Sequence, residues 1–199
     1  PRNVCDAVSP PSVPVTEKQI VSISQARILL DHVRKNRLEV FLALALTTGM
    51  RRGEMLALRW SDVDLVHGSL QILRTVDYIP HYGYVETEAK TARGRRKIML
   101  TSFILEMLNS HRAQQMEERY KVGDKWIDKN LVFCGLKGNY FNPSYLLRVF
   151  KKALAAAGLP HMHIHDLRHS AATILLSMNV HPKVVQELLG HSSITITMD

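Results

Sequence analysis

The stretch from His161 to Met178, HMHIHDLRHSAATILLSM, contains a histidine and an arginine where a helix is expected to begin. Its apolar residues recur at the 3.6-residue period of one helix face, at Leu167, Ala171, Ile174, Leu175 and Met178. His165 and Arg168 are three residues apart, so their side chains leave neighbouring positions of the first helical turn. The free N–H groups and the positive dipole end of a helix lie at the same place. We therefore predict a site for an oxyanion, above all a phosphate; the alternative is a basic helix start in solvent.

A second candidate, Arg51, is predicted on a tight joint between two packed helices. Residues 38–48 are apolar almost all round, which is typical of a helix at the centre of a bundle. Gly49 is expected to end that helix, and the next helix is expected from Arg52 to Leu58. Such a joint holds a side chain in a fixed position, as a catalytic group requires.

The other elements are predicted from hydrophobic period, caps and turn residues. Helices are expected at 25–33 and 102–120, with Ser24 and Ser102 as their N-caps, and at 143–157 and 182–189. Strands are expected at 69–78, 84–88 and 96–100, and a short buried strand at 131–133. We predict an α+β fold that is mostly helical, with a small antiparallel three-stranded sheet.

The composition is that of one ordinary domain with a basic surface. The chain has 199 residues, of which 46% are hydrophobic, and this is enough to bury a core. The net charge of +8 favours a nucleic acid partner, or less often an anionic membrane surface. No run approaches the roughly 18 apolar residues of a membrane span. Cys5 and Cys134 lack metal-ligand spacing and fit a reducing cytoplasm.

Three stretches together resemble the catalytic domain of the tyrosine recombinases, the phage and transposon integrase family. TTGMRRGEMLALRWSDVD is similar to that family's first arginine box, HDLRHSAATILL to its His-x-x-Arg box, and LGHSSI to its third box. A single His-x-x-Arg is a weak signal, whereas three boxes in this order and at these separations are specific. The resemblance covers the chain from about Val15 onward.

Carried over position by position, the resemblance implies a set of catalytic residues and one supporting residue. The catalytic residues are Arg51, Lys90, His165, Arg168 and His191, and the supporting residue is Glu54. Lys90 matches the hairpin lysine of the family and lies in the basic turn 89–95, for which a solvated hairpin tip is the alternative.

The cleavage of a phosphodiester explains why these residue types belong together. Arg51 and Arg168 can each give paired N–H donors to the non-bridging oxygens, which gain negative charge in the transition state. Each charged hydrogen bond contributes roughly 1.5–3 kcal/mol, so two such clamps and His191 can remove several kcal/mol from the barrier. The hairpin lysine can protonate the leaving 5′-oxygen. His165 can help to take the proton of the nucleophile, and Glu54 would orient Arg51 or His165.

The nucleophile of the family is a tyrosine about ten residues past the third-box histidine, and no tyrosine of this chain matches it. We expect that tyrosine just after Asp199, outside the chain, and we therefore expect the chain to be a fragment. Residues 1–15 are expected to be the remnant of an interdomain linker. Residues 16–199 are expected to be the catalytic domain, truncated before its nucleophile, with the N-terminal core-binding domain absent.

The resemblance implies that the parent protein is a site-specific DNA recombinase, an integrase of a phage or mobile element. Such an enzyme breaks and rejoins DNA strands through a 3′-phosphotyrosyl intermediate, which keeps the bond energy and needs no cofactor. The sequence contains no Gly-rich phosphate loop and no evident carboxylate cluster for metals. The expected partners are double-stranded DNA attachment sites and further copies of the chain, as a tetramer on DNA, with no membrane. The expected location is the bacterial cytoplasm or nucleoid.

Three alternatives remain open at this point. His161, His163, His165 and His169 could hold a zinc ion. The protein could be a DNA-binding recombinase relative without cleavage activity. It could also be a type IB topoisomerase, which shares the chemistry, although the small size and the integrase-like boxes favour the recombinase.

Overall fold

The computed structural model describes residues 19–89 and 94–190, together with Ser193 and Thr197. The expected linker at 1–15 therefore lies outside the described residues. The helices are α1 (Ile23–His32), α2 (Glu39–Thr48), α3 (Arg52–Leu56), α4 (Ser102–Val122), α5 (Pro143–Ala156), α6 (Asp166–Ser177) and α7 (Pro182–Leu189), with 3₁₀ turns η2 (Trp60–Asp62) and η3 (Gly123–Lys125). The strands are β1 (Val63–Asp64), β2 (Ser69–Ile72), β3 (Arg74–Ile79), β4 (Gly83–Glu88) and β5 (Arg96–Met99).

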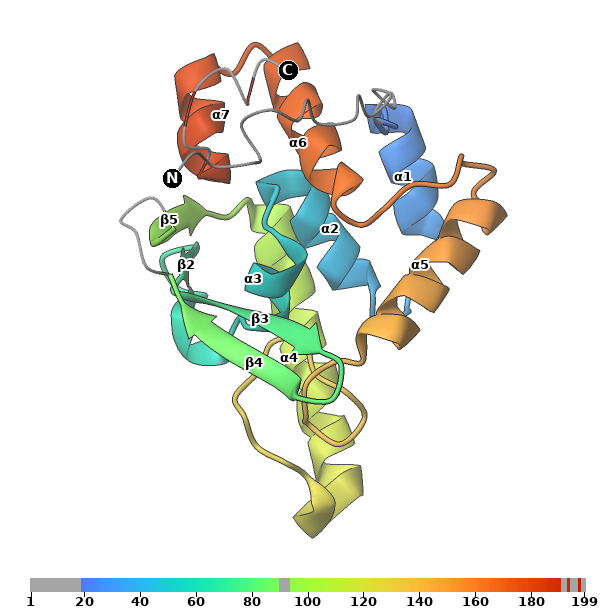
Figure 1. The fold of residues 1–199 in the computed structure, drawn as a ribbon, viewed down its shortest axis with the longest axis vertical. Helices are drawn as coiled ribbons and strands as arrows, with labels where there is room; N and C mark the ends of the chain where they lie inside the picture. The colour runs from blue at the N-terminus through green and yellow to red at the C-terminus, as the bar shows by residue number, and fades with distance from the viewer. Residues whose placement is uncertain (1–18, 90–93, 191–192, 194–196, 198–199) are drawn as a thin grey trace, which may run out of the picture.

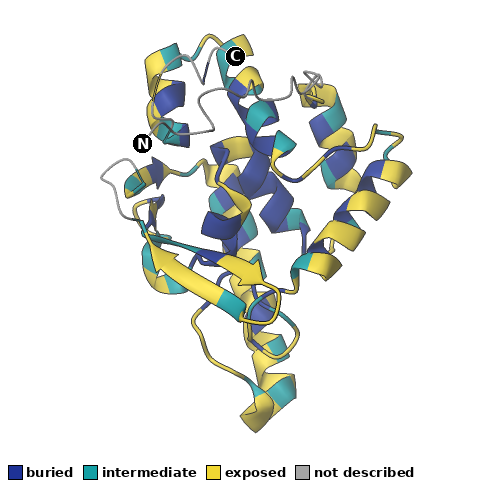
Figure 2. Ribbon diagram, viewed as in Figure 1, coloured by how far each residue is buried: buried dark blue, intermediate teal, exposed yellow. Residues whose placement is uncertain are grey.

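Helix α2 is the centre of the fold, as its apolar sequence predicts. It packs against α1, α3, α4 and α6, and its residues from Val40 to Leu46 are all buried. Figure 2 shows the buried residues concentrated where α2 and α6 lie, and exposed residues along α5, the β3–β4 hairpin and the far end of α4. No described helix has the combination of length and apolar character needed to cross a membrane.

The strands form two separate antiparallel ladders, and this differs in detail from the predicted sheet. The expected strand 69–78 is interrupted at Leu73: β2 pairs with β1 and β5, while β3 pairs with β4. The three-stranded sheet thus has the order β1-β2-β5, and the β3–β4 hairpin extends in front of α3 and α4 (Figure 1). The α+β fold class is confirmed, but the strand membership of the sheet was wrong.

Several element boundaries also differ from the prediction, because other side chains provide the caps. Ser22, and not Ser24, caps α1, and it exchanges hydrogen bonds with Gln25 in a capping box. Thr101, and not Ser102, caps α4 by accepting from the backbone N–H of Ile104. Residues 131–133 are buried as expected, but they form no strand, and Leu131 alone makes an isolated bridge to Arg59.

Candidate functional site

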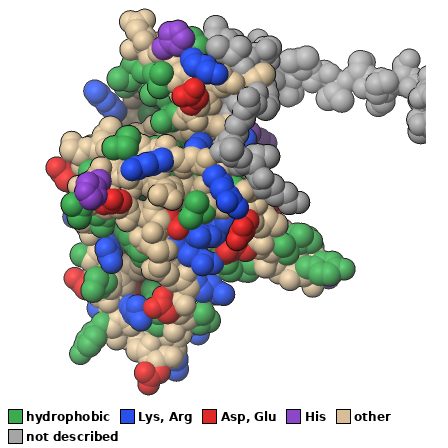
Figure 3. All heavy atoms as spheres, turned by 90° about the vertical axis from the view of Figure 1, so that its left-hand side faces the viewer, with side chains coloured by type: hydrophobic (Ala, Val, Ile, Leu, Met, Phe, Trp, Pro, Cys, Tyr) green, Lys and Arg blue, Asp and Glu red, His purple; other side chains and the backbone are tan. Residues whose placement is uncertain are grey.

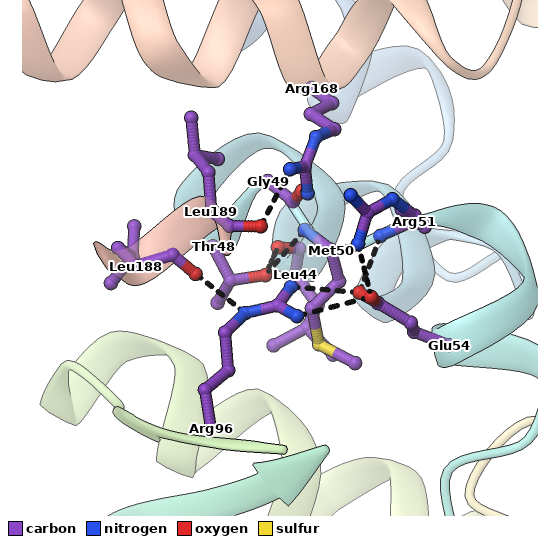
Figure 4. Close-up of polar contacts among 10 residues, drawn as sticks. All are labelled: Leu44, Thr48, Gly49, Met50, Arg51, Glu54, Arg96, Arg168, Leu188 and Leu189. Atoms are coloured by element: carbon purple, nitrogen blue, oxygen red, sulfur yellow. Dashed lines mark hydrogen bonds and ion pairs between the residues drawn. The ribbon is translucent and has the colours of Figure 1, made fainter. Parts of the chain in front are cut away.

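Arg51 lies on the joint between α2 and α3, where Gly49 turns the chain with a left-handed φ of +61°. Glu54, one turn later, holds Arg51 in two ways. Its Oε2 accepts from the Arg51 backbone N–H at 2.9 Å, and its Oε1 accepts from Arg51 Nη1 at 2.9 Å (Figure 4). The Arg51 side chain is still 45% exposed, so the rest of its guanidinium is open to a ligand.

Glu54 is itself buried, with 7% of its side chain exposed, and a second arginine holds it from the other side. Arg96, at the start of β5, donates from Nη2 to Glu54 Oε2 at 2.8 Å and from Nη1 to Oε1 at 3.1 Å. Burial alone would raise the pKa of Glu54, but the hydrogen bonds and charges of Arg96 and then Arg51 outweigh it and hold this pKa below its usual value. Glu54 is therefore ionised and accepts from both guanidinium groups at neutral pH.

Arg168, on the first turn of α6, is almost completely buried and bonds to two backbone carbonyls. Its Nη1 donates to Gly49 O at 2.7 Å and its Nη2 donates to Leu189 O at 2.6 Å. Burial above all, then the positive charges of Arg51 and Arg96 against the opposing charge of Glu54, lowers the pKa of Arg168 to about 9. Positive charge is thus in excess around this side chain, which favours the arrival of an anion.

Arg96 and Arg168 cap the C-terminal turn of α7. Arg96 Nε donates to Leu188 O at 2.8 Å, next to the Leu189 carbonyl that Arg168 binds. The last carbonyls of a helix have no partner within it and carry its negative dipole end, so guanidinium groups are well suited to this position. Gly190 ends the helix with a left-handed φ of +69°, immediately before His191.

Of the two histidines of the second box, His169 is half-buried and His165 is on the surface. His165 precedes α6 and is exposed, and its ring meets the ring of His169 edge-on with centroids 5.3 Å apart. His161 and His163 make a similar pair at 5.6 Å. The described part of the chain contains no group of three or more His, Cys, Asp or Glu side chains that could hold a metal ion, so the zinc alternative has no ligand set there.

Of the predicted site residues, the structure brings Arg51, Glu54 and Arg168 together. His165 is exposed immediately before α6, and Lys90 and His191 lie outside the described residues. Arg96 was missed as a site residue. A signal for it does exist, because residues alternate between the two faces of a strand. Arg96 is on the same face of β5 as Ile98, which is buried, so an arginine there is directed inward.

The chain belongs to the phage integrase family, whose profile matches residues 15–199. It is 34% identical to a XerC-like tyrosine recombinase of Caldanaerobacter subterraneus subsp. tengcongensis, over 92% of this chain and 49% of that protein. It is 31% identical to the integrase of Staphylococcus phage L54a, over 87% of this chain and 51% of that protein. The predicted family is confirmed, and the chain spans about half the length of these curated relatives.

Solved structures agree on the fold. The Tn1549 transposon integrase in complex with circular intermediate DNA superposes with a TM-score of 0.80 at 20% identity, over 99% of this chain and 66% of that one. The XerA recombinase superposes with a TM-score of 0.72 at 21% identity, over 96% of this chain and 60% of that one. The helical bundle with its small sheets is therefore the fold of the tyrosine recombinase catalytic domains.

Proposed function

We propose that this chain is the catalytic domain of a site-specific DNA recombinase, which breaks and rejoins DNA strands through a 3′-phosphotyrosyl intermediate. The observation that carries the proposal is the excess of positive charge where Arg51 and Arg168 meet. Glu54 alone opposes Arg51 and Arg96 among the charges that act on Arg168 in the described part of the chain. A phosphate would supply the negative charge that this cluster lacks.

The positions of Arg51 and Arg168 support the roles proposed for them, and the roles of His165, Lys90 and His191 are proposed from the resemblance of their boxes to those of the family. Arg51 is half-exposed and would clamp one non-bridging oxygen, while the part of the Arg168 guanidinium not bound to carbonyls would contact the other. Because both arginines are already fixed by hydrogen bonds, little reorganisation is needed when a phosphate binds. We assign His165 to the proton of the nucleophile, Lys90 to the leaving 5′-oxygen, and His191 to the phosphate.

The proposed partners are double-stranded DNA attachment sites. The Tn1549 integrase structure is a complex with DNA, which supports a DNA partner here. On the face drawn in Figure 3, Lys and Arg side chains gather near the middle. Exchange between two duplexes involves four strands, which favours four copies of the protein. A location in the bacterial cytoplasm or nucleoid, a nucleophilic tyrosine after Asp199 and a preceding DNA-binding domain belong to the same proposal.

The test is to trap the covalent intermediate with a nicked duplex whose short 5′-hydroxyl fragment diffuses away after cleavage. The protein should contain this chain and the residues that follow Asp199 in its parent. We expect a protein–DNA adduct that is resistant to denaturation, with the DNA attached to a tyrosine identified by tandem mass spectrometry.

Arg51→Ala should reduce the rate of adduct formation by about 10²- to 10³-fold, the usual loss for one transition-state donor. Arg34→Ala, at an exposed surface position, is the control and should leave the rate unchanged. If the protein binds the duplex but never forms an adduct, it is a DNA-binding relative without cleavage activity. If Arg51→Ala cleaves like the unmodified protein, the phosphate clamp proposed for Arg51 is wrong.

A further inference from the structure

Arg96 bonds both to Glu54 on α3 and to the end of α7. Two of its nitrogens hold the Glu54 carboxylate and the third holds the Leu188 carbonyl. Only 8% of this side chain is exposed, so it is not a surface charge that samples solvent. Its planar guanidinium offers all these donors in a fixed geometry, which a lysine cannot reproduce.

Each oxygen of Glu54 accepts from both arginines. Oε1 binds Arg51 Nη1 and Arg96 Nη1, and Oε2 binds the Arg51 backbone N–H and Arg96 Nη2. The carboxylate is therefore held jointly by the buried Arg96 guanidinium and the Arg51 backbone N–H, and it in turn directs the half-exposed Arg51 side chain. Without Arg96, Glu54 would keep only its bonds to Arg51 itself, and the direction of the Arg51 guanidinium would be less firmly fixed.

The contact with α7 adds a second constraint. Arg96 binds Leu188 O, and Arg168 binds the next carbonyl along the chain, Leu189 O. A shift of the α7 turn would thus move both bonds together. Arg96 connects the element that carries Arg51 to the turn that holds Arg168, so it can fix the spacing of the two side chains (Figure 4).

We propose that Arg96 is a positioning residue for DNA strand cleavage. It acts through Glu54 to hold the Arg51 side chain at a fixed position relative to Arg168. This inference rests on the proposed function. In the cleavage step the tyrosine oxygen forms a bond to phosphorus, the bond to the 5′-oxygen breaks, and that oxygen takes up a proton. Arg96 touches none of these atoms; it keeps the charge clamp on the non-bridging oxygens in place.

The experiment compares two nicked substrates in the adduct assay, one with a phosphodiester and one with a methylphosphonate at the cleaved position. The methylphosphonate lacks the negative charge, so its cleavage depends less on a correctly placed arginine. Arg96→Lys and Arg96→Gln should slow adduct formation on the phosphodiester by about 10- to 100-fold, the scale expected for a misplaced reacting geometry. The loss on the methylphosphonate should be several-fold smaller, and Arg51→Ala should shift the ratio of the two rates in the same direction.

Lys97→Gln is the matched control, because it removes a positive charge from the next residue of β5, which is exposed. It should leave both rates unchanged. An unfolded fraction lowers both rates of one preparation equally, so the ratio still reports on positioning if an Arg96 variant is poorly stable. Equal losses on the two substrates, or rates like those of Lys97→Gln, would overturn the proposal for Arg96. Absence of any adduct with the unmodified protein would instead contradict the proposed function.

Discussion

Glu54 lies between the guanidinium groups of Arg51 and Arg96, and its burial makes it depend on both. Removing one member of a buried charge network leaves the others unpaired, which is more costly than the net value of the pair. The same network lowers the pKa of Glu54, so its contribution to stability must change with pH.

Glu54→Gln should lower the free energy of unfolding at pH 7 by about 1.5–3 kcal/mol, since charged hydrogen bonds are lost. Glu54 has a lowered pKa in the folded state, so its contribution is complete above the ordinary value near 4.5 and is lost as the pH falls through the folded value. The difference in the free energy of unfolding between the variant and the unmodified protein should therefore be constant from pH 7 to about pH 5 and should become smaller in stronger acid. Urea unfolding at a series of pH values measures it.

Glu88→Gln provides the comparison for that series, because Glu88 is an exposed carboxylate that also pairs with an arginine. It should change the free energy of unfolding very little at any pH, as exposed pairs generally do. A gap for Glu54→Gln that stays the same down to pH 3 would show that the carboxylate charge is not what the two arginines require.

The three-residue spacing of Arg51 and Glu54 makes their contact predictable from sequence, since such residues are neighbours on one turn. Arg96 is 42 residues from Glu54, and no local rule connects them. The orientation of Arg168 was also beyond the sequence. Its first-turn position suggested an exposed anion site, whereas the packing of α6 on α2 and α7 buries it against two carbonyls.

The joint between α2 and α3 depends on Gly49, which has both a left-handed φ and a close neighbour. A Cβ added at Gly49 would collide with the side chain of Leu189 on α7 and would lie 3.5 Å from the Cβ of Ala171 on α6. The joint, α6 and α7 therefore meet where only a hydrogen atom fits.

Gly49→Ala should destabilise the protein by about 2–4 kcal/mol, because the strain of a left-handed residue adds to the cost of overpacking. Gly158→Ala is the matched variant. Gly158 has a similar φ of +65° after α5, but nothing lies within 4 Å of an added Cβ. It should cost only about 1–2 kcal/mol. Thermal unfolding measures the stability of both variants, and the difference between them gives the cost of the collision with Leu189 on α7. Equal losses of stability would mean that α7 moves aside without cost.

The helices were predictable because their apolar periods are long, and α2 shows this best. The break between β2 and β3 was not predictable. Leu70, Ile72 and Val76 are all buried and are separated by two and four residues, so they would lie on one face of a continuous strand. The pattern of burial thus continues across Leu73, although the strand that supplies the hydrogen bonds changes from β5 to β4. Pairing between strands depends on contacts distant in sequence, which periodicity does not report.

The net charge of +8 is the feature of the protein that bears most directly on DNA binding. Part of it is buried in the arginine cluster, but much of it is on the surface, for example at Lys151 and Lys152 on the exposed side of α5. A surface of this kind attracts a polyanion over a distance and releases the counterions of the DNA on contact.

Affinity for duplex DNA should therefore fall steeply with salt. If about six phosphates are neutralised, the association constant should drop by about 10³-fold between roughly 50 and 200 mM salt. Fluorescence anisotropy with a labelled duplex measures the slope, and a Lys151→Gln, Lys152→Gln double variant should make it shallower if α5 contacts the backbone. A dissociation constant that changes less than about two-fold across this range would be incompatible with a DNA-binding surface.

The β3–β4 hairpin forms a ladder of its own, and this gives the fold a position where length can vary. The register of Arg96 is set by its pairing with Ile72 on β2, and no hairpin residue contributes to that pairing. Residues 80–82 at the tip are exposed. Insertions and deletions can therefore accumulate at the tip during evolution while the arginine network keeps its geometry. Relatives can differ in outline at this hairpin and still share the same interior chemistry.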